Sequence, residues 1–134
     1  MTLRRERTLL QLAVALACIV PLTASITGIA LGARWLQPAP AVDMDSHFRY
    51  LSGLFLVMGL GFASCVPAIE RKSGRLRLLG AMVVVGGLAR LVSLSQIGTP
   101  SIGHMTGLAI ELGVVPAILG WQTRVAHLYR VRGD

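Results

Sequence analysis

Four long apolar stretches, nearly free of charge, limit what this chain can fold into more than any other feature of its sequence. They run from Thr8 to Ala33, Tyr50 to Ile69, Leu78 to Ile97 and Met105 to Thr123. A helix that crosses a bilayer needs about 20 mostly apolar residues, and a helix satisfies its own backbone hydrogen bonds in lipid. Charged residues make up 14% of the chain, against about 25% in a typical soluble domain.

We therefore predict an all-α polytopic membrane protein, a four-transmembrane-helix up-down bundle. The predicted helices cover about residues 8–33, 48–69, 77–97 and 104–123 of a single transmembrane domain, residues 1–134. A signal peptide is the alternative for the first stretch, but its 26 uncharged residues exceed the about 7–15 apolar residues of such a signal. Pro21 and Pro116 lie within the first and fourth helices, where we expect local kinks.

The basic residues predict the orientation of the chain in the membrane. Ten of the thirteen lie before the first helix, between the second and third, or after the fourth: Arg4, Arg5, Arg7, Arg71, Lys72, Arg75, Arg77, Arg124, Arg130 and Arg132. Four crossings place all ten on one side, and basic loops favour the cytoplasm. We therefore predict a multi-pass membrane protein with both termini in the cytoplasm. Because these residues flank apolar helices, we interpret them as signals for topology and anionic lipid, with no nucleic acid partner.

Two charged residues interrupt the apolar stretches, Arg90 in the third and Glu111 in the fourth. A charge at the centre of a bilayer costs at least about 2.5–3.5 kcal/mol. Arg90 lies seven residues before Ile97 and Glu111 six residues after Met105, so each is roughly 10 Å below the same surface. A short turn joins the two helices, which makes them antiparallel neighbours. We therefore predict that the two side chains form an ion pair.

Further polar residues fall at the same end of the predicted helices. We predict a polar cluster in the outer half of the bundle, made of Arg49, Arg90, Glu111, His47, Tyr50, Ser93 and His104. Gly86 and Gly87 share a helix face with Arg90, and such small residues let neighbouring helices approach closely.

Two interpretations of the cluster stay open. The ion pair is either a clamp that sets helix pairing or part of a ligand or proton site. One acid cannot neutralise two arginines, so Arg49 either keeps a guanidinium free for a carboxylate, phosphate or headgroup, or extends to the membrane interface.

No HExxH, GxSxG or P-loop motif occurs in the sequence. Cys18 and Cys65 lack CxxC spacing and lie in apolar stretches, so we interpret them as small buried hydrophobic residues. A metal site made of two histidines and a nearby aspartate is an alternative reading of the outer end. We predict no catalytic residue, no metal and no cofactor, and a quinone or a lipid stays open as a ligand.

Three stretches carry a resemblance to a known family: HFRYLSGLFL at 47–56, GLARLVSLSQIG at 87–98 and ELGVVPAILGWQTRVA at 111–126. They resemble a family of small four-helix bacterial membrane proteins catalogued only as a domain of unknown function. The resemblance implies a bacterial inner membrane, four helices and no assigned reaction. In architecture the chain is also similar to DoxX-like four-helix membrane proteins, some of which are linked to quinone or thiol redox systems. The cysteine pair that thiol chemistry would need is absent here.

Three functions are compatible with the sequence. We favour a non-enzymatic membrane module, either an accessory subunit of a larger membrane complex or a small-ligand binder. The DoxX-like resemblance implies a redox or quinone-associated component. A small transporter is the third, and it would need a homo-oligomer because four short helices rarely enclose a pathway. Small-residue pairs such as Gly28 and Gly32 would suit contacts between copies or packing within one chain.

Overall fold

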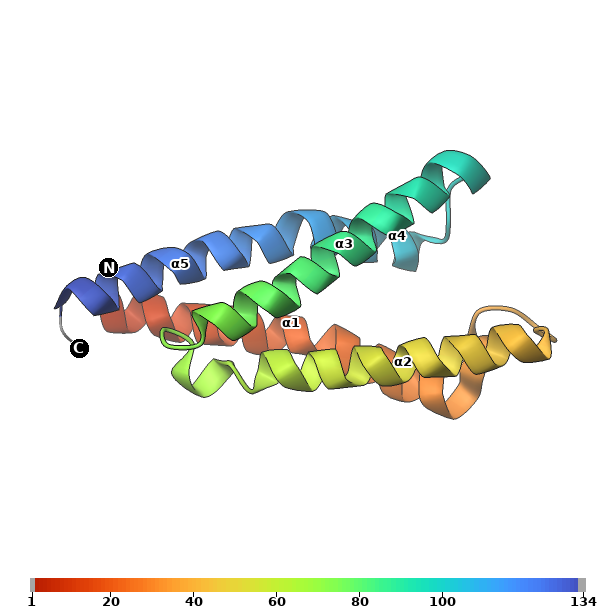
Figure 1. Cartoon of the computed structure of the whole chain (residues 1–134), viewed down its shortest axis with the longest axis horizontal. Coiled ribbons are helices and arrows are strands. Elements are labelled where there is room, and N and C mark those ends of the chain that lie inside the picture. The colour runs from red at the N-terminus through yellow and green to blue at the C-terminus, as the bar shows by residue number, and fades with distance from the viewer. Residues whose placement is uncertain (1, 133–134) are drawn as a thin grey trace. The chain divides into compact units, whose positions relative to one another are not determined.

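The protein is an all-helical chain in a computed structural model that describes residues 2–132. Short 3₁₀ turns, η1 (Gly32–Trp35) and η2 (Val66–Ala68), follow the first and second helices. The longer helical elements, shown in Figure 1, are α1 (Leu3–Leu31), α2 (Val42–Ala63), α3 (Ser73–Ile97), α4 (Ile102–Ala109) and α5 (Val115–Arg132). A π-helical turn, η3 (Ile110–Val114), joins α4 to α5, so the two form one long fourth helix.

Four of these helical segments are long and apolar enough to cross a membrane: Leu3–Trp35, Val42–Ala68, Ser73–Ile97 and Ile102–Arg132. No strand occurs among the described residues. The prediction of an all-α chain with four helices fit to span a bilayer is therefore confirmed. The N-terminal and C-terminal orientation stays a prediction.

The first and last helices extend beyond the apolar stretches from which they were predicted. α1 begins at Leu3 and α5 continues to Arg132, whereas hydropathy placed these two boundaries near residues 8 and 123. Arginine and glutamate are good helix formers, so a helix continues through charged flanks that do not belong in lipid. α2 begins at Val42 with Asp43 and Asp45 in its first turn, where negative charge favours the helix dipole.

Residues 12–66 form one compact unit, a hairpin of α1 and α2. α1 ends at Leu31, and the next residue, Gly32, has a φ of +63° that is favourable for glycine and costly for other residues. A Cβ on Gly28 would strike the Ser52 hydroxyl, and one on Gly59 would come within 3.1 Å of Leu22. Gly28 thus serves packing within the chain. Small residues at these positions let the two helices approach closely.

Among the described residues, 2–11 and 67–132 form the other unit, in which α3 packs along η3 and α5. Gly80 faces Leu119, and Gly87 faces Leu112, each with a side-chain carbon under 3.0 Å from where a Cβ would lie. The neighbouring Gly86 does not follow the prediction, because a Cβ there would meet nothing within 4 Å. Of the two adjacent glycines, only Gly87 lies on the face of α3 that closely approaches its neighbour.

Candidate functional site at a π-helical turn

Arg90 of α3 and Glu111 of η3 form a bidentate ion pair, joined by two hydrogen bonds. Arg90 Nε donates to Glu111 Oε2 at 3.1 Å, and Arg90 Nη2 donates to Glu111 Oε1 at 3.0 Å. The side chain of Arg90 is 35% exposed and that of Glu111 is 16% exposed. The structure thus brings together the two charged residues that the depth argument matched. This side-on geometry aligns two parallel hydrogen bonds and is the strongest arrangement an arginine offers a carboxylate.

Local backbone geometry positions Glu111. The N–H of Val115 donates to the carbonyl of Ile110, five residues back, which is the bond that defines a π-turn. Pro116 has no N–H, so it offers no donor to the carbonyl of Glu111. At the position where a kink near Pro116 was predicted, the fourth helix therefore contains a π-turn, and this turn includes Glu111. Such turns occur often at functional sites.

Gly87 supplies the close contact beneath the ion pair. The position of its absent Cβ lies 3.0 Å from Glu111 Cβ and 2.8 Å from Leu112 Cδ2. Glu111 Cβ is bonded to the main chain and cannot move far. A side chain at Gly87 would therefore push α3 away from η3 and lengthen the ion pair.

Arg90 keeps hydrogen-bonding capacity beyond Glu111. A guanidinium carries five N–H groups, and Glu111 accepts from two of them. The remaining three N–H groups, two of them on Nη1, have no partner among residues 2–132. The side chain of Arg90 is also about one-third exposed, so part of it is accessible from outside the chain.

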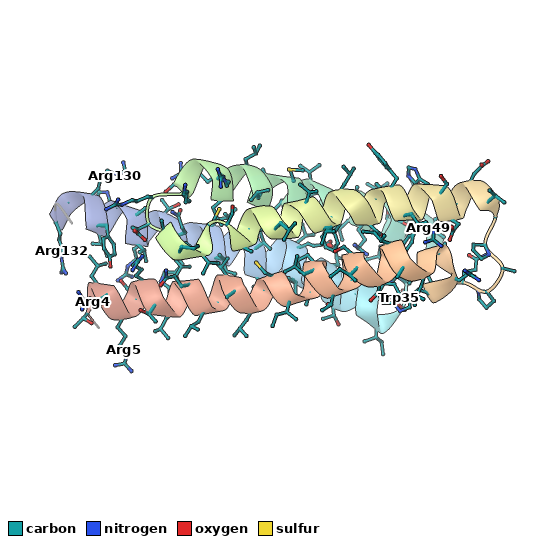
Figure 2. All side chains as sticks on the ribbon, turned by 90° about the horizontal axis from the view of Figure 1, so that it is seen from below. Arg4, Arg5, Trp35, Arg49, Arg130 and Arg132 are labelled. Carbon is teal, nitrogen blue, oxygen red and sulfur yellow. The ribbon has the colours of Figure 1, made fainter. Side chains whose placement is uncertain are left out.

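Arg49 has its own partners in the α1–α2 hairpin. Its Nε donates to Asp45 Oδ2 at 2.8 Å, and its Nη1 donates to the carbonyls of Ile29 and Ala30. Asp45 also accepts the N–H of Ala33 at 2.8 Å. The expectation that Arg49 is left without an acid is therefore corrected, because Asp45 lies one turn away on the same helix. Arg49 and Asp45 tie the end of α1 to the start of α2, near Trp35 (Figure 2).

The remaining predicted site residues make smaller local contacts. The rings of His47 and Tyr50 lie 6.5 Å apart on exposed positions of α2. His104 Nδ1 lies 2.9 Å from the Ser101 hydroxyl, and no hydrogen bond joins it to the Arg90 pair in the described part of the chain. Ser93 is exposed on α3. A single cluster that unites all seven residues stays a prediction, because they are divided between the two units.

Metal-binding groups are not assembled in the described residues. Within 2–132, no three His, Cys, Asp or Glu side chains come together in a way that could hold a metal ion. Cys18 and Cys65 are both buried free cysteines.

The basic end of the chain holds contacts that sequence reasoning did not identify. Arg7 donates to Glu70 at 2.7 Å, and Arg124 pairs with Glu6 at 3.3 Å. Arg4 and Arg5 lie at the same end as Arg130 and Arg132 (Figure 2). The signal for these pairs was weak, because Glu6 and Glu70 are two acids among many arginines and any of several partners was compatible with the sequence.

Gln122 is a second feature that sequence reasoning passed over. Its side chain is fully buried, and its Nε2 donates to the Ile69 carbonyl at 2.8 Å and to Ser73 Oγ at 2.7 Å. The turn before α3 is thereby attached to α5. Its Oε1 is buried without a hydrogen-bond partner among the described residues. A lone glutamine in an apolar helix was the available signal.

Residues 9–122 match the family described as Domain of unknown function (DUF4345). The chain belongs to this family. The predicted resemblance to a family catalogued only as a domain of unknown function is thus confirmed, and the match includes both members of the ion pair. Comparison with curated proteins gave no match, and neither did comparison with solved structures. The likeness of this DUF4345 chain to DoxX-like proteins stays a prediction.

Proposed function

We propose that this DUF4345 protein is a non-enzymatic small-ligand-binding module of the bacterial inner membrane, with Arg90 and Glu111 as its binding site. One observation carries the proposal: a bidentate ion pair lies within helices long and apolar enough to span a membrane, and it leaves three arginine N–H groups without a partner in the described residues. A charge in this position costs free energy, and a purely structural clamp has no use for an accessible donor edge.

The chemistry of the donor edge defines the ligand class. Glu111 cancels the charge of Arg90, so the site offers hydrogen-bond donors with little net charge. Hydrogen bonds are stronger in a low dielectric than in water. The favoured ligand is therefore an apolar molecule with a carbonyl or similar acceptor oxygen, such as a quinone or a lipid ester. Glu111 holds the guanidinium plane fixed, which lowers the entropy cost of binding.

The orientation supports a site in the outer half of the membrane. Four arginines, Arg4, Arg5, Arg130 and Arg132, gather at one end of their unit (Figure 2). Basic residues favour the cytoplasm, so both termini are cytoplasmic and the ion pair lies nearer the outer surface. Reporter fusions after Arg77 and at the C-terminus should both report cytoplasm, and a periplasmic signal from either would contradict this orientation.

Purification in a mild detergent followed by native mass spectrometry tests the proposed function. The parent protein should carry a small-molecule adduct that the Arg90→Met, Glu111→Leu double variant loses. Arg132→Gln, a charge loss at the end of α5, serves as the control and should retain the adduct. A parent without any adduct, or a double variant that keeps it, would overturn the proposal.

The identity of what co-purifies separates the related functions. A quinone adduct would specify a redox-associated component, whereas a stable partner protein without a small molecule would replace the proposal by an accessory-subunit role. A homodimer without an adduct would favour a small transporter over the binding module.

A further inference from the structure

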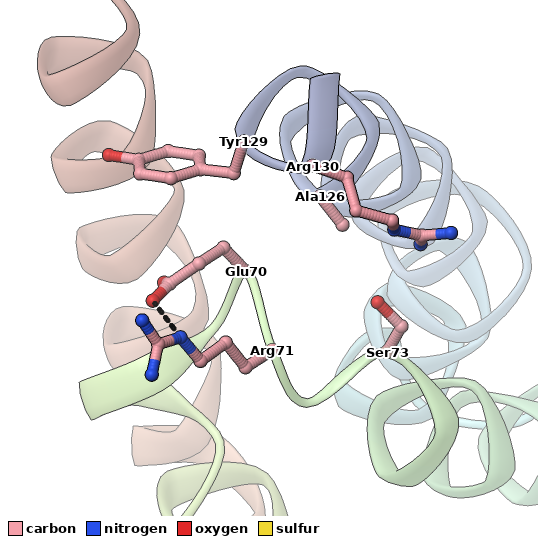
Figure 3. A pocket seen from close by; sticks show the side chains of 6 residues that line it. All are labelled: Glu70, Arg71, Ser73, Ala126, Tyr129 and Arg130. Carbon is pink, nitrogen blue, oxygen red and sulfur yellow. Dashed lines mark ion pairs between the residues drawn. The ribbon is translucent and has the colours of Figure 1, made fainter. Parts of the chain in front are cut away.

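A cavity of about 360 Å³ opens at the basic end of the chain, away from the Arg90 site. Its lining comes from the turn before α3 and from the last turns of α5: Glu70, Arg71, Ser73, Ala126, Tyr129 and Arg130. Its volume lies within the about 300–1,000 Å³ of small-molecule sites. All six residues belong to one compact unit. Figure 3 shows Tyr129 and Arg130 extending from α5 on either side of the small side chain of Ala126.

The charge balance of this Arg71–Arg130 cavity is positive. Glu70 is its acid, and its carboxylate already accepts from Arg7 at 2.7 Å and lies 3.9 Å from Arg71 (Figure 3). Arg7 and Arg71 lie against this one carboxylate, and Arg130 adds a further guanidinium to the lining from α5, away from Glu70 (Figure 3). The three arginines and the one acid leave a surplus of two positive charges. The side chain of Arg71 is 77% exposed, so its guanidinium can turn towards a ligand.

The rest of the lining also suits an anion. Ser73 is the first residue of α3, and the Lys72 side chain makes no capping hydrogen bond there. The first N–H groups of a helix carry partial positive charge and bind phosphate readily. Gln122 bonds to Ser73 Oγ and holds this turn against α5. The two segments that line the cavity, the turn before α3 and the end of α5, are therefore held together by a buried hydrogen bond.

The position along the helices suits a membrane surface. The cavity lies between the end of the candidate span Val42–Ala68 and the start of the span Ser73–Ile97, beside the last turn of Ile102–Arg132. Tyrosine is enriched at the headgroup level of membranes, and Tyr129 lines the cavity.

We propose that the Arg71–Arg130 cavity is a binding site for a phosphate group, carried by an anionic lipid headgroup or supplied as free phosphate. Arg71 and Arg130 donate to the phosphate oxygens, and the start of α3 adds the N–H groups of its first turn. Lipid phosphodiesters and inorganic phosphate share this chemistry, so the two sources are separated by experiment.

Binding to the full-length protein in detergent tests the site, with native mass spectrometry as the readout. The probes are phosphatidylglycerol, diacylglycerol as the lipid without phosphate, and inorganic phosphate as competitor. The Arg71→Gln, Arg130→Gln variant should bind phosphatidylglycerol at least about tenfold more weakly than the parent. The matched variant Arg77→Gln, Arg132→Gln removes two exposed charges at the same end outside the cavity and should stay within about twofold of the parent.

A steric variant tests the cavity with its charges intact. Ala126→Phe should fill the space and weaken phosphatidylglycerol binding by a similar factor, and circular dichroism checks that the variant is folded. Competition by inorganic phosphate would assign the site to free phosphate as well, and lack of competition would assign it to the lipid. Equal losses in the cavity and matched variants would overturn the proposal, as would diacylglycerol binding as tightly as phosphatidylglycerol. The arginine variants decide the matter if Ala126→Phe does not fold.

Discussion

Removing one member of the Arg90–Glu111 pair should destabilise the protein by about 2–4 kcal/mol. Loss of one partner from a fully buried ion pair costs about 3–5 kcal/mol, because the other charge stays buried without compensation. Glu111 is 16% exposed and approaches that limit, whereas Arg90 is 35% exposed, so the cost is reduced towards the lower end.

The two single variants should differ in size. In Arg90→Ala the remaining carboxyl group can take up a proton and become neutral, whereas in Glu111→Ala the remaining guanidinium stays charged. Glu111→Ala should therefore be the more damaging of the two single variants. The double variant Arg90→Met, Glu111→Leu leaves no charge behind and should return to within about 1 kcal/mol of the parent.

Unfolding of the purified protein by a denaturing detergent, followed by circular dichroism, measures these free energies. Arg132→Ala at the exposed end of α5 is the control and should lie within about 0.5 kcal/mol of the parent. If both single variants are as stable as the parent, the two residues do not stabilise each other and the ion-pair reasoning is wrong. If the double variant is as unstable as the singles, packing at these positions matters more than charge.

Three further substitutions test the surrounding packing, with the same unfolding measurement. Gly87→Ala should cost about 1–3 kcal/mol because its Cβ would press on the facing turn, whereas Gly86→Ala, which meets nothing, should not be destabilising. Gly32→Ala requires a positive φ and should destabilise by at least about 1 kcal/mol, while Gly53→Ala should be harmless. Gln122→Leu removes two hydrogen bonds of a fully buried side chain and should cost about 1–3 kcal/mol. If Gly87→Ala, Gly32→Ala or Gln122→Leu is as stable as the parent, the interaction assigned to that residue is wrong.

The sequence by itself determined the four helices and the meeting of Arg90 with Glu111. Hydropathy over about 20 residues is a local property, and a helix satisfies its own backbone, so no distant contact is needed to predict it. Residue counting gave the depth of both charges, and the short connection at Gly98–Ser101 made their helices antiparallel neighbours. Equal depth on adjoining helices left each charge one obvious partner.

The tertiary structure decided which partner a residue takes when several are in reach. Arg49 could have paired within the predicted outer cluster or with Asp45 on its own helix. It pairs with Asp45, because the end of α1 places backbone carbonyls beside the Arg49 guanidinium. The buried hydrogen bonds of Gln122 and the Arg71–Arg130 cavity both form where the turn before α3 meets α5. Contacts between segments about 50 residues apart have no counterpart in local pattern.

Helical phase is the physical reason for the remaining differences. One residue turns a helix by about 100°, so adjacent glycines such as Gly86 and Gly87 point in different directions, and composition cannot say which one faces a neighbour. The π-turn at Ile110–Val114 changes the phase of everything after it. Local sequence therefore determined where the helices lie along the chain, and only packing between them decided which faces meet.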